Sequence, residues 1–154
     1  MDQLGLGIPT AGAKRFLSEM VGRRVAVIGD VMLDAYLNGR VERTSVEAPV
    51  PIVAVESEER LLGGAANVAK CLVALGARVR LCGVIGADAE GRLFLSEARG
   101  LGVDVSGVLA DAARPTTLKR RVVAQGQQML RLDYESTSRL EGAIQRRLLR
   151  EARE

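Results

Sequence analysis

A continuous apolar run at residues 25–28, ended by Gly29-Asp30, is the feature that most limits the possible folds. A run of this kind is typical of a strand that is buried on both faces of a parallel sheet. Residues 63–86 supply its partner: Gly63-Gly64 opens a helix over 65–75, and residues 79–84 form a second buried strand. Parallel strands need a long crossover, usually a helix, so the sequence predicts an α/β fold with a parallel sheet.

The alternation of helices and strands continues on both sides of this unit. The patterns predict further helices over 9–21, 89–100 and 138–154 and a further strand over 103–109. Asp88 and Ser138 are suitable N-caps for the last two helices. Leu140, Ile144 and Leu148 recur at a spacing of four, which predicts the buried face of the last helix. Because no strand follows this helix, we expect residues 1–154 to be the N-terminal part of a single, longer α/β domain.

Two other segments have the character of exposed strands. Residues 31–62 combine a turn at Asn38-Gly39-Arg40, an extended stretch at 47–51 that contains two prolines, and a short strand at 52–55. Residues 116–124 and 128–134 alternate polar and apolar side chains around Gln125-Gly126-Gln127, which predicts a hairpin. We expect these segments to form a small sheet that stands off the main core.

The composition limits the kinds of catalysis and metal binding that are possible and indicates the cellular compartment. The chain has no His and only two Cys, Cys71 and Cys82, which excludes His-dependent nucleophilic catalysis, a His-based metal site and a Cys₄ zinc site. Both Cys lie in apolar stretches typical of core residues in a reducing cytoplasm. No apolar run approaches the roughly 20 residues of a membrane span, and the N-terminus lacks the regions of a secretion signal. We therefore expect a cytoplasmic protein without a membrane partner.

The charge balance favours a small anionic ligand over a nucleic acid. The chain carries 22 Lys and Arg against 19 Asp and Glu, a net charge of +3, with the two signs interspersed. Aromatic residues make up 3% of the chain, so few side chains could stack on bases, and we expect no nucleic-acid partner. A phosphate ester is compatible with this balance.

The first candidate site is the Gly-Asp-Val-Met-Leu-Asp run at residues 29–34. Ligands of open α/β sheets bind at the carboxyl ends of the strands, and this run places Asp30 and Asp34 there. Carboxylate oxygens accept hydrogen bonds and so suit the hydroxyls of a sugar. The structural alternative, which composition alone favours, is that either Asp caps a turn.

The second candidate is the run from Gly63-Gly64 to Asn67. Glycines let the backbone approach a ligand closely, and the amides at a helix N-terminus favour anions or hydroxyls. The run matches neither the Walker loop nor Gly-x-Gly-x-x-Gly. An ordinary turn from strand to helix is the alternative, although an amide such as Asn67 inside a helix is mildly unfavourable and calls for a ligand.

The third candidate is the pair Lys119 and Arg121, which share one strand face because side chains alternate with a period of two. Adjacent cations repel each other unless an anion lies between them, and a phosphate would satisfy both. A solvated edge strand, whose charges discourage aggregation, is the alternative and is favoured by the pattern alone.

These runs, in this order and with the Glu-Ala-Pro-Val-Pro stretch at residues 47–51, resemble the ribokinase-type (phosphofructokinase B) sugar kinases. Residues 117–121 and 127–133 continue the resemblance, which covers about residues 25–135. Within that family the chain is most similar to the D-glycero-β-D-manno-heptose-7-phosphate kinases, which also occur as the kinase half of a bifunctional kinase/adenylyltransferase.

The resemblance implies a three-layer, Rossmann-type α/β domain with a parallel sheet and a small β-sheet lid at about 37–62 and 116–134. It implies transfer of the γ-phosphate of ATP, with magnesium, to the anomeric hydroxyl of heptose 7-phosphate, giving the 1,7-bisphosphate for the lipopolysaccharide core. The implied partners are the phosphorylated sugar and either a second copy bound through the lid or a complementary C-terminal half. By position, the implied substrate-binding residues are Asp30, Asp34, Gly63, Gly64, Asn67, Lys119 and Arg121.

One departure from the family pattern limits the expected activity. The catalytic Asp, its Gly-Ala-Gly-Asp anion hole and the adenine pocket lie downstream in this family, and no Gly-x-Gly-Asp occurs in these 154 residues. We therefore expect no catalytic, cofactor-binding or metal-binding residues here, and an acceptor-sugar half that is inactive alone. The alternatives are a non-catalytic interaction module or part of a sugar kinase with another specificity.

Overall fold

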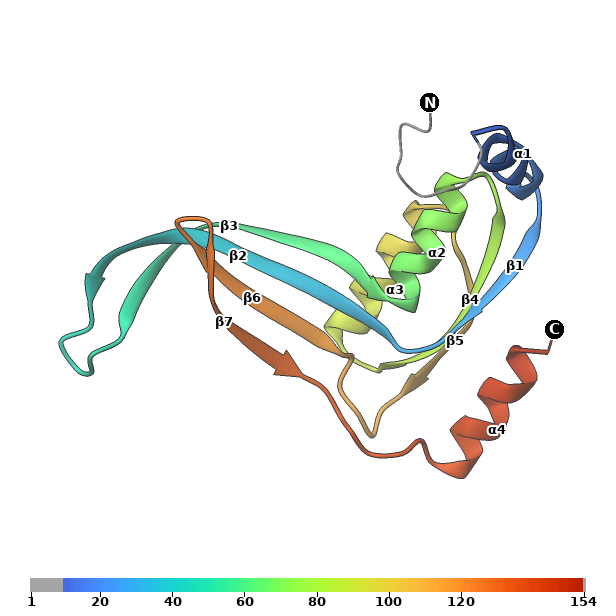
Figure 1. Cartoon of the computed structure of the whole chain (residues 1–154). Helices are drawn as coiled ribbons and strands as arrows, with labels where there is room; N and C mark the ends of the chain where they lie inside the picture. Colours follow the sequence, from blue (N-terminus) through green and yellow to red (C-terminus); the bar gives the residue numbers. More distant parts are fainter. Residues whose placement is uncertain (1–9, 154) are drawn as a thin grey trace.

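The computed structural model describes residues 10–153 as two sheets and four helices (Figure 1). In chain order the elements are α1 (Thr10–Met20), β1 (Arg24–Ile28), β2 (Val31–Thr44), β3 (Pro51–Gly64), α2 (Ala65–Ala74), β4 (Arg78–Gly86), α3 (Ala89–Gly100), β5 (Asp104–Asp111), β6 (Leu118–Ala124), β7 (Gln127–Tyr134) and α4 (Gly142–Glu151).

The body of the molecule is a parallel sheet with the order β1-β4-β5, covered by helices on both faces. Leu81 of β4 is fully buried and belongs to the same core as Ala66 of α2 and Phe94 of α3. The next residue, Cys82, points to the other face, where its Sγ lies 3.7 Å from the carbonyl oxygen of Glu151 at the end of α4. The predicted three-layer arrangement with a parallel sheet is therefore confirmed.

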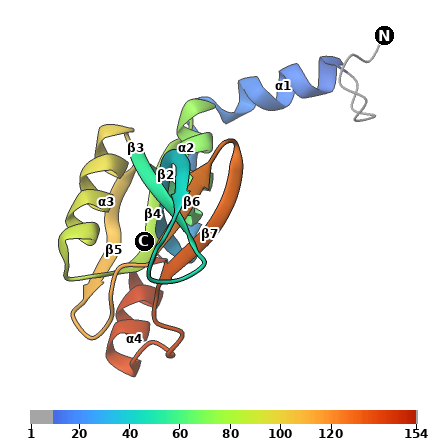
Figure 2. The ribbon, with the colours of Figure 1, turned by 90° about the vertical axis from the view of Figure 1, so that its left-hand side faces the viewer.

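The second sheet, called the lid here, has the strand order β3-β2-β6-β7 and projects away from the body (Figures 1 and 2). It pairs β2 with β3 and β6 with β7 in antiparallel fashion, and β2 with β6 in parallel. At its root Val31, Leu33 and Ala35 of β2 are buried in the body's core. The lid is thus anchored at the carboxyl ends of the body's strands, the edge where ligands of open α/β sheets bind.

Three sequence predictions about the elements are wrong. Asn38-Gly39-Arg40 is no turn but lies inside β2, where the pairing with β3 shifts register after Asn38. The predicted short strand at 52–55 extends over the whole of β3, which ends at Gly64; the same glycine is the N-cap of α2, so the predicted helix start is correct. Most side chains of β3 are exposed, so its sequence shows no apolar alternation from which its length could be predicted.

The third wrong prediction concerns the start of the last helix. Helix α4 begins at Gly142 with Glu141 as N-cap, and Ser138 lies in the preceding loop. Its predicted buried face is only half-buried: Ile144 and Leu148 on α4, and Leu140 in the loop before it, are partly covered while most of their neighbours are exposed. The hairpin at 125–127 is confirmed: Gln125 and Gly126 both have positive φ, as a tight two-residue turn between strands requires.

A buried hydrogen-bonded cluster joins the lid to the body. The Asp88 side chain caps α3 by accepting from the Gly91 amide at 2.8 Å. It also accepts from the Thr116 amide at 2.7 Å and the Thr116 hydroxyl at 2.6 Å. The same hydroxyl accepts from the Gly86 amide at 2.9 Å, and Thr116 is 2% exposed. This cluster fixes the chain two residues before β6, so it sets where the lid leaves the body.

We expect Thr116→Val to lower the free energy of unfolding by about 1–3 kcal/mol, because it leaves the buried Gly86 amide without its acceptor. Thr117→Val is the matched control, since the hydrogen bond of Thr117 in this region runs through its carbonyl oxygen. Urea unfolding of both variants measures the difference. Equal stabilities of the two variants would show that the cluster contributes nothing.

The Asp88 carboxylate also predicts a pH dependence of stability. Burial alone would raise the pKa of Asp88, but the hydrogen bonds from Thr116 and Gly91 outweigh it and hold that pKa below its ordinary value. The charged form is therefore favoured in the folded state, and its contribution is present above the unfolded-state pKa and lost as the pH falls through the folded-state pKa. We expect the stability advantage of the wild type over Asp88→Asn to shrink as the pH falls below about 4. A constant difference in unfolding free energy between pH 7 and pH 2 would contradict this.

Candidate functional site

Three of the predicted site residues meet on one face of the lid. Asp34 of β2 accepts a hydrogen bond from the Arg121 guanidinium of β6, and the two side chains are 21% and 20% exposed. The strands bring them together because β2 and β6 are paired in parallel, 87 residues apart in sequence. Gly63 of β3 lies directly behind Asp34, since a Cβ at this position would collide with Asp34 Oδ2. The carboxylate is thus packed between a glycine and an arginine.

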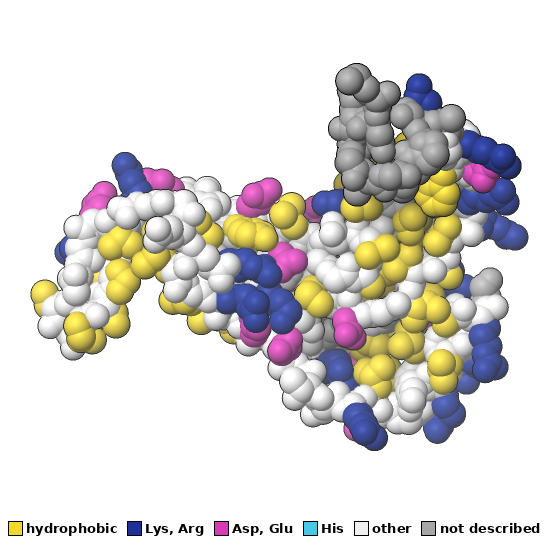
Figure 3. All heavy atoms as spheres, in the orientation of Figure 1, with side chains coloured by type: hydrophobic (Ala, Val, Ile, Leu, Met, Phe, Trp, Pro, Cys, Tyr) yellow, Lys and Arg dark blue, Asp and Glu magenta, His cyan; other side chains and the backbone are white. Residues whose placement is uncertain are grey.

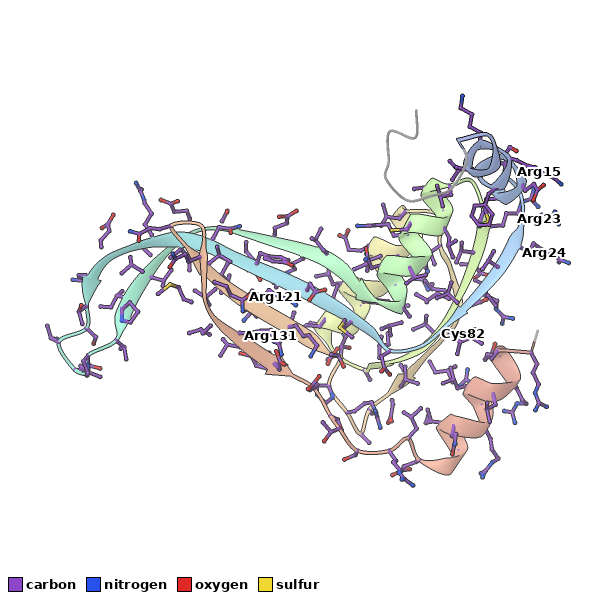
Figure 4. The ribbon with its side chains drawn as sticks, viewed as in Figure 1. Arg15, Arg23, Arg24, Cys82, Arg121 and Arg131 are labelled. Carbon is purple, nitrogen blue, oxygen red and sulfur yellow. The ribbon has the colours of Figure 1, made fainter. Side chains whose placement is uncertain are left out.

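A network of charges continues from this pair across β6 and β7 (Figures 3 and 4). Lys119 donates to Asp133 at 3.3 Å and to Glu135 at 3.1 Å, and these contacts raise the pKa of Lys119. Arg131 holds both oxygens of Asp133, at 2.7 and 2.9 Å, and together with Lys119 lowers the pKa of that carboxyl. Lys119 and Arg121 do share one face as predicted, but each already has a carboxylate partner.

Asp30 and Gly64 meet at the junction between the body and the lid. A Cβ at Gly64 would collide with the Asp30 carbonyl oxygen, and the same oxygen accepts from the Ala65 amide at 2.8 Å. Gly64 has a φ of 56°, a conformation that favours glycine. The Asp30 side chain is exposed and lines a cavity of about 460 Å³ together with Arg114, Thr117 and Glu135.

The structure therefore divides the seven predicted residues instead of gathering them in one cavity. Asp34, Gly63, Lys119 and Arg121 belong to the lid face, whereas Asp30 lines the cavity at the strand ends. Asn67, in the first turn of α2, is exposed, and its side chain makes no hydrogen bond within residues 10–153. The roles of all seven as ligands stay predictions.

Two side chains that the sequence analysis did not single out contribute to the site. The ring of Tyr36 lies under the Arg121 guanidinium, 5.3 Å from its carbon to the ring centroid. Alternation along a strand places residues two apart on one face, so the position of Tyr36 beside Asp34 was open to prediction. Glu135, which binds Lys119, follows β7 and carries no such signal.

Neither a metal centre nor a membrane span is found in the part of the chain that the structure describes. Within residues 10–153 no three His, Cys, Asp or Glu side chains are grouped so that they could hold a metal ion. None of the helices in this range has the length and apolar character needed to cross a membrane.

Sequence comparison finds curated relatives that match most of the chain. The chain is 48% identical over 127 residues to the bifunctional protein HldE of Helicobacter pylori strain P12, a match that covers 82% of this chain and 28% of that protein. It is 56% identical over 110 residues to the bifunctional protein HldE of Geobacter metallireducens, covering 71% of this chain and 22% of that protein. The chain thus spans little more than a quarter of the length of the curated relatives it matches.

Solved structures support the same fold. Arabidopsis thaliana ribokinase, solved in complex with ribose and ATP, superposes with a TM-score of 0.63 at 20% identity, over 86% of this chain and 43% of the ribokinase. Halothermothrix orenii fructokinase superposes with a TM-score of 0.55 at 26% identity, over 74% of this chain and 38% of that chain. The model of the pfkB family of carbohydrate kinases matches residues 23–148, which is most of the chain. With the parallel sheet, the lid and this match in agreement, the chain belongs to the pfkB carbohydrate kinase family.

Proposed function

We propose that this chain forms the acceptor-sugar site of a cytoplasmic heptose kinase, in which ATP phosphorylates D-glycero-β-D-manno-heptose 7-phosphate at C1 to give the 1,7-bisphosphate. The observation that carries the proposal is the placement of Asp34 between Gly63 and Arg121 on the lid face. The identity of 48–56% to proteins named HldE supports a heptose phosphate as the acceptor.

The chemistry of the three side chains suits a phosphorylated sugar. A carboxylate such as Asp34 accepts hydrogen bonds from two or more hydroxyls and so fixes the orientation of a sugar ring. The glycine at 63 leaves room for Asp34, because any larger side chain would displace it. The Arg121 guanidinium can bind a phosphate with two parallel hydrogen bonds.

ATP and magnesium are the cofactors that the family implies, and the described residues do not fit them. Within residues 10–153 no three His, Cys, Asp or Glu side chains are grouped so that they could hold a metal ion by themselves. The cavity at the strand ends is lined by the carboxylates of Asp30 and Glu135, which oppose a triphosphate, and by one cation, Arg114, which is already paired with Asp111. We therefore propose that residues 1–154 bind the acceptor but do not by themselves transfer a phosphoryl group, since transfer needs groups that stabilise the charge of the moving phosphoryl.

The test is a pair of measurements on the purified chain. We expect saturable binding of heptose 7-phosphate, weaker binding of ribose 5-phosphate and fructose 6-phosphate, and no ATP consumption that depends on the heptose. Equal affinity for all three sugar phosphates would overturn the heptose assignment. ATP consumption that depends on heptose 7-phosphate would overturn the proposal that these residues are inactive alone.

A second candidate function is self-association through the lid, and one observation favours it. Leu130, Leu132 and Tyr134 alternate along β7 and so share a face, yet they are 47%, 42% and 48% exposed. The lid also ends in two strands, β3 and β7, that have no further partner within the described part of the chain, and free strand edges readily pair with another chain.

We expect a homodimer in which this apolar face of β7 is covered by a second copy. Leu132→Lys places a charge in the interface, so we expect it to shift the chain from dimer to monomer in sedimentation experiments. The matched control is Gln128→Lys, because Gln128 is an exposed residue of the same strand, β7. Val123→Lys on the neighbouring strand would not serve, because Val123 is half-buried. A monomeric wild type at high concentration would exclude this function.

A further inference from the structure

Two of the predicted ligand residues, Asp34 and Arg121, neutralise each other, and this contact affects what the site can bind. We propose that Arg121 exchanges between Asp34 and the phosphate group of the acceptor, so that a phosphorylated sugar frees Asp34 for its own hydroxyls whereas an unphosphorylated sugar does not. The inference rests on the proposed function, because it takes the acceptor to be a sugar phosphate. It makes Arg121 the residue that sets the preference for phosphorylated acceptors.

The first step of the argument is that Asp34 is not available to a sugar in this structure. One of its oxygens, Oδ1, accepts from Arg121, and the other, Oδ2, lies against Gly63. Both charged side chains are about four-fifths covered, at 21% and 20% exposure, so water screens this ion pair less than a surface pair. A sugar hydroxyl that is to reach Oδ1 must therefore displace the guanidinium.

The second step is that Arg121 is the cation on this face that can change partners most easily. Lys119 is held by two carboxylates, Asp133 and Glu135. The Arg131 guanidinium donates hydrogen bonds to both carboxylate oxygens of Asp133. Arg121 has a single ion pair among the described residues, through one of its terminal nitrogens, and its guanidinium otherwise rests on an aromatic ring.

The third step is that a phosphate competes well for this guanidinium. A phosphate ester carries up to two negative charges and three acceptor oxygens, and it matches the arginine fork with two parallel hydrogen bonds. The ring of Tyr36 can support the guanidinium in either position, because the attraction to a ring face does not depend on which anion the cation binds. Once Arg121 has turned to the phosphate, Asp34 regains a free charge and free lone pairs.

The consequence is a coupling between the two ends of the ligand. Binding of phosphate at Arg121 strengthens binding of hydroxyls at Asp34, and by linkage the reverse holds equally. A neutral sugar has to break the ion pair without replacing it, whereas a sugar phosphate replaces it. Couplings of this kind change affinities by about 5- to 150-fold, enough to select a phosphorylated acceptor.

The experiment measures three ligands, inorganic phosphate, unphosphorylated heptose and heptose 7-phosphate, by calorimetric titration of the full chain. We expect Arg121→Met to weaken the binding of heptose 7-phosphate by at least about tenfold and to tighten the binding of unphosphorylated heptose by about threefold or more. We expect Asp34→Asn to tighten the binding of inorganic phosphate by about threefold or more, because it frees the Arg121 guanidinium. Arg131→Met is the matched control. Arg131 is a neighbouring arginine that pairs with Asp133 and not with Asp34, so its removal should change neither the binding of heptose 7-phosphate nor that of unphosphorylated heptose in this way. Melting curves confirm that each variant is folded.

Failure of the exchange and failure of the proposed function give different results. If the wild type binds heptose 7-phosphate but Arg121→Met leaves the affinity for unphosphorylated heptose unchanged or lower, the exchange is overturned and the acceptor site stands. If the wild type binds neither sugar while Asp34→Asn still tightens inorganic phosphate, the exchange is supported and the heptose assignment fails. If neither variant differs from Arg131→Met with any ligand, the exchange is overturned.

Discussion

Asp34→Asn is expected to weaken the binding of heptose 7-phosphate by about 10- to 100-fold, because hydrogen bonds to a charged acceptor contribute about 1.5–3 kcal/mol. The asparagine amide keeps the size of the side chain but removes its charge and one of its two acceptor oxygens. The fold should survive, since Asp34 is not part of the buried core and its ion pair lies on the lid.

The control for this prediction is Asp133→Asn, two strands away on the same lid face. Asp133 binds Lys119 and Arg131 but makes no contact with Asp34 among the described residues. We expect Asp133→Asn to change the affinity for heptose 7-phosphate by less than about threefold, because it alters only the carboxylate partner of Lys119 and Arg131. Equal losses in the two variants would show that the face responds to net charge and that Asp34 has no special role.

Gly64→Ala is expected to lower the free energy of unfolding by about 2 kcal/mol or more. The backbone at Gly64 has a φ of 56°, which an alanine adopts only with strain, and the new Cβ would collide with the Asp30 carbonyl oxygen. Relief of the collision has to move either the start of α2 or the turn between β1 and β2 that contains Asp30. The substitution therefore also displaces Asp30 at the cavity, so we expect weaker sugar binding in whatever fraction remains folded.

Gly100→Ala is the matched control for this strain. Gly100 is the last residue of α3, its φ is not positive, and an added Cβ meets no atom within 4 Å. We expect it to be neutral or to stabilise by up to about 1 kcal/mol, because alanine is the better helix former. Urea unfolding of the two variants separates strain from the general effect of adding a methyl group, and a Gly64→Ala protein as stable as Gly100→Ala would contradict the account.

The body of the fold was predictable because residues 25–28 and 79–84 carry continuous apolar runs with a helix between them, the pattern of a parallel crossover. Burial on both faces is correct for β4 but wrong for β1, whose alternate residues are exposed, Ile28 to 54%. The lid was only partly predictable. Strands β2 and β3 project from the body with much of their length exposed, so neither their extent nor the bulge after Asn38 leaves a pattern in the sequence.

The site shows the same division between local and long-range information. The residue types at Asp34 and Arg121, and the face that Lys119 and Arg121 share, follow from strand periodicity. The ion pair between Asp34 and Arg121 depends on the register of β2 against β6, strands that lie far apart in the chain, and register is set by tertiary packing. Sequence reasoning therefore named both residues as ligands but did not predict the ion pair between them.

The central claim, that the lid face around Asp34 binds the acceptor sugar phosphate, is tested most directly by titrating the isotope-labelled chain with heptose 7-phosphate and following its amide NMR signals. The account predicts saturable shifts at Asp34, Gly63 and Arg121. It also predicts that the open sheet face near Arg24 and Arg78, at the amino ends of the body's strands, stays unchanged. Saturable shifts that leave the lid face untouched, or no shifts at millimolar heptose 7-phosphate, would contradict it.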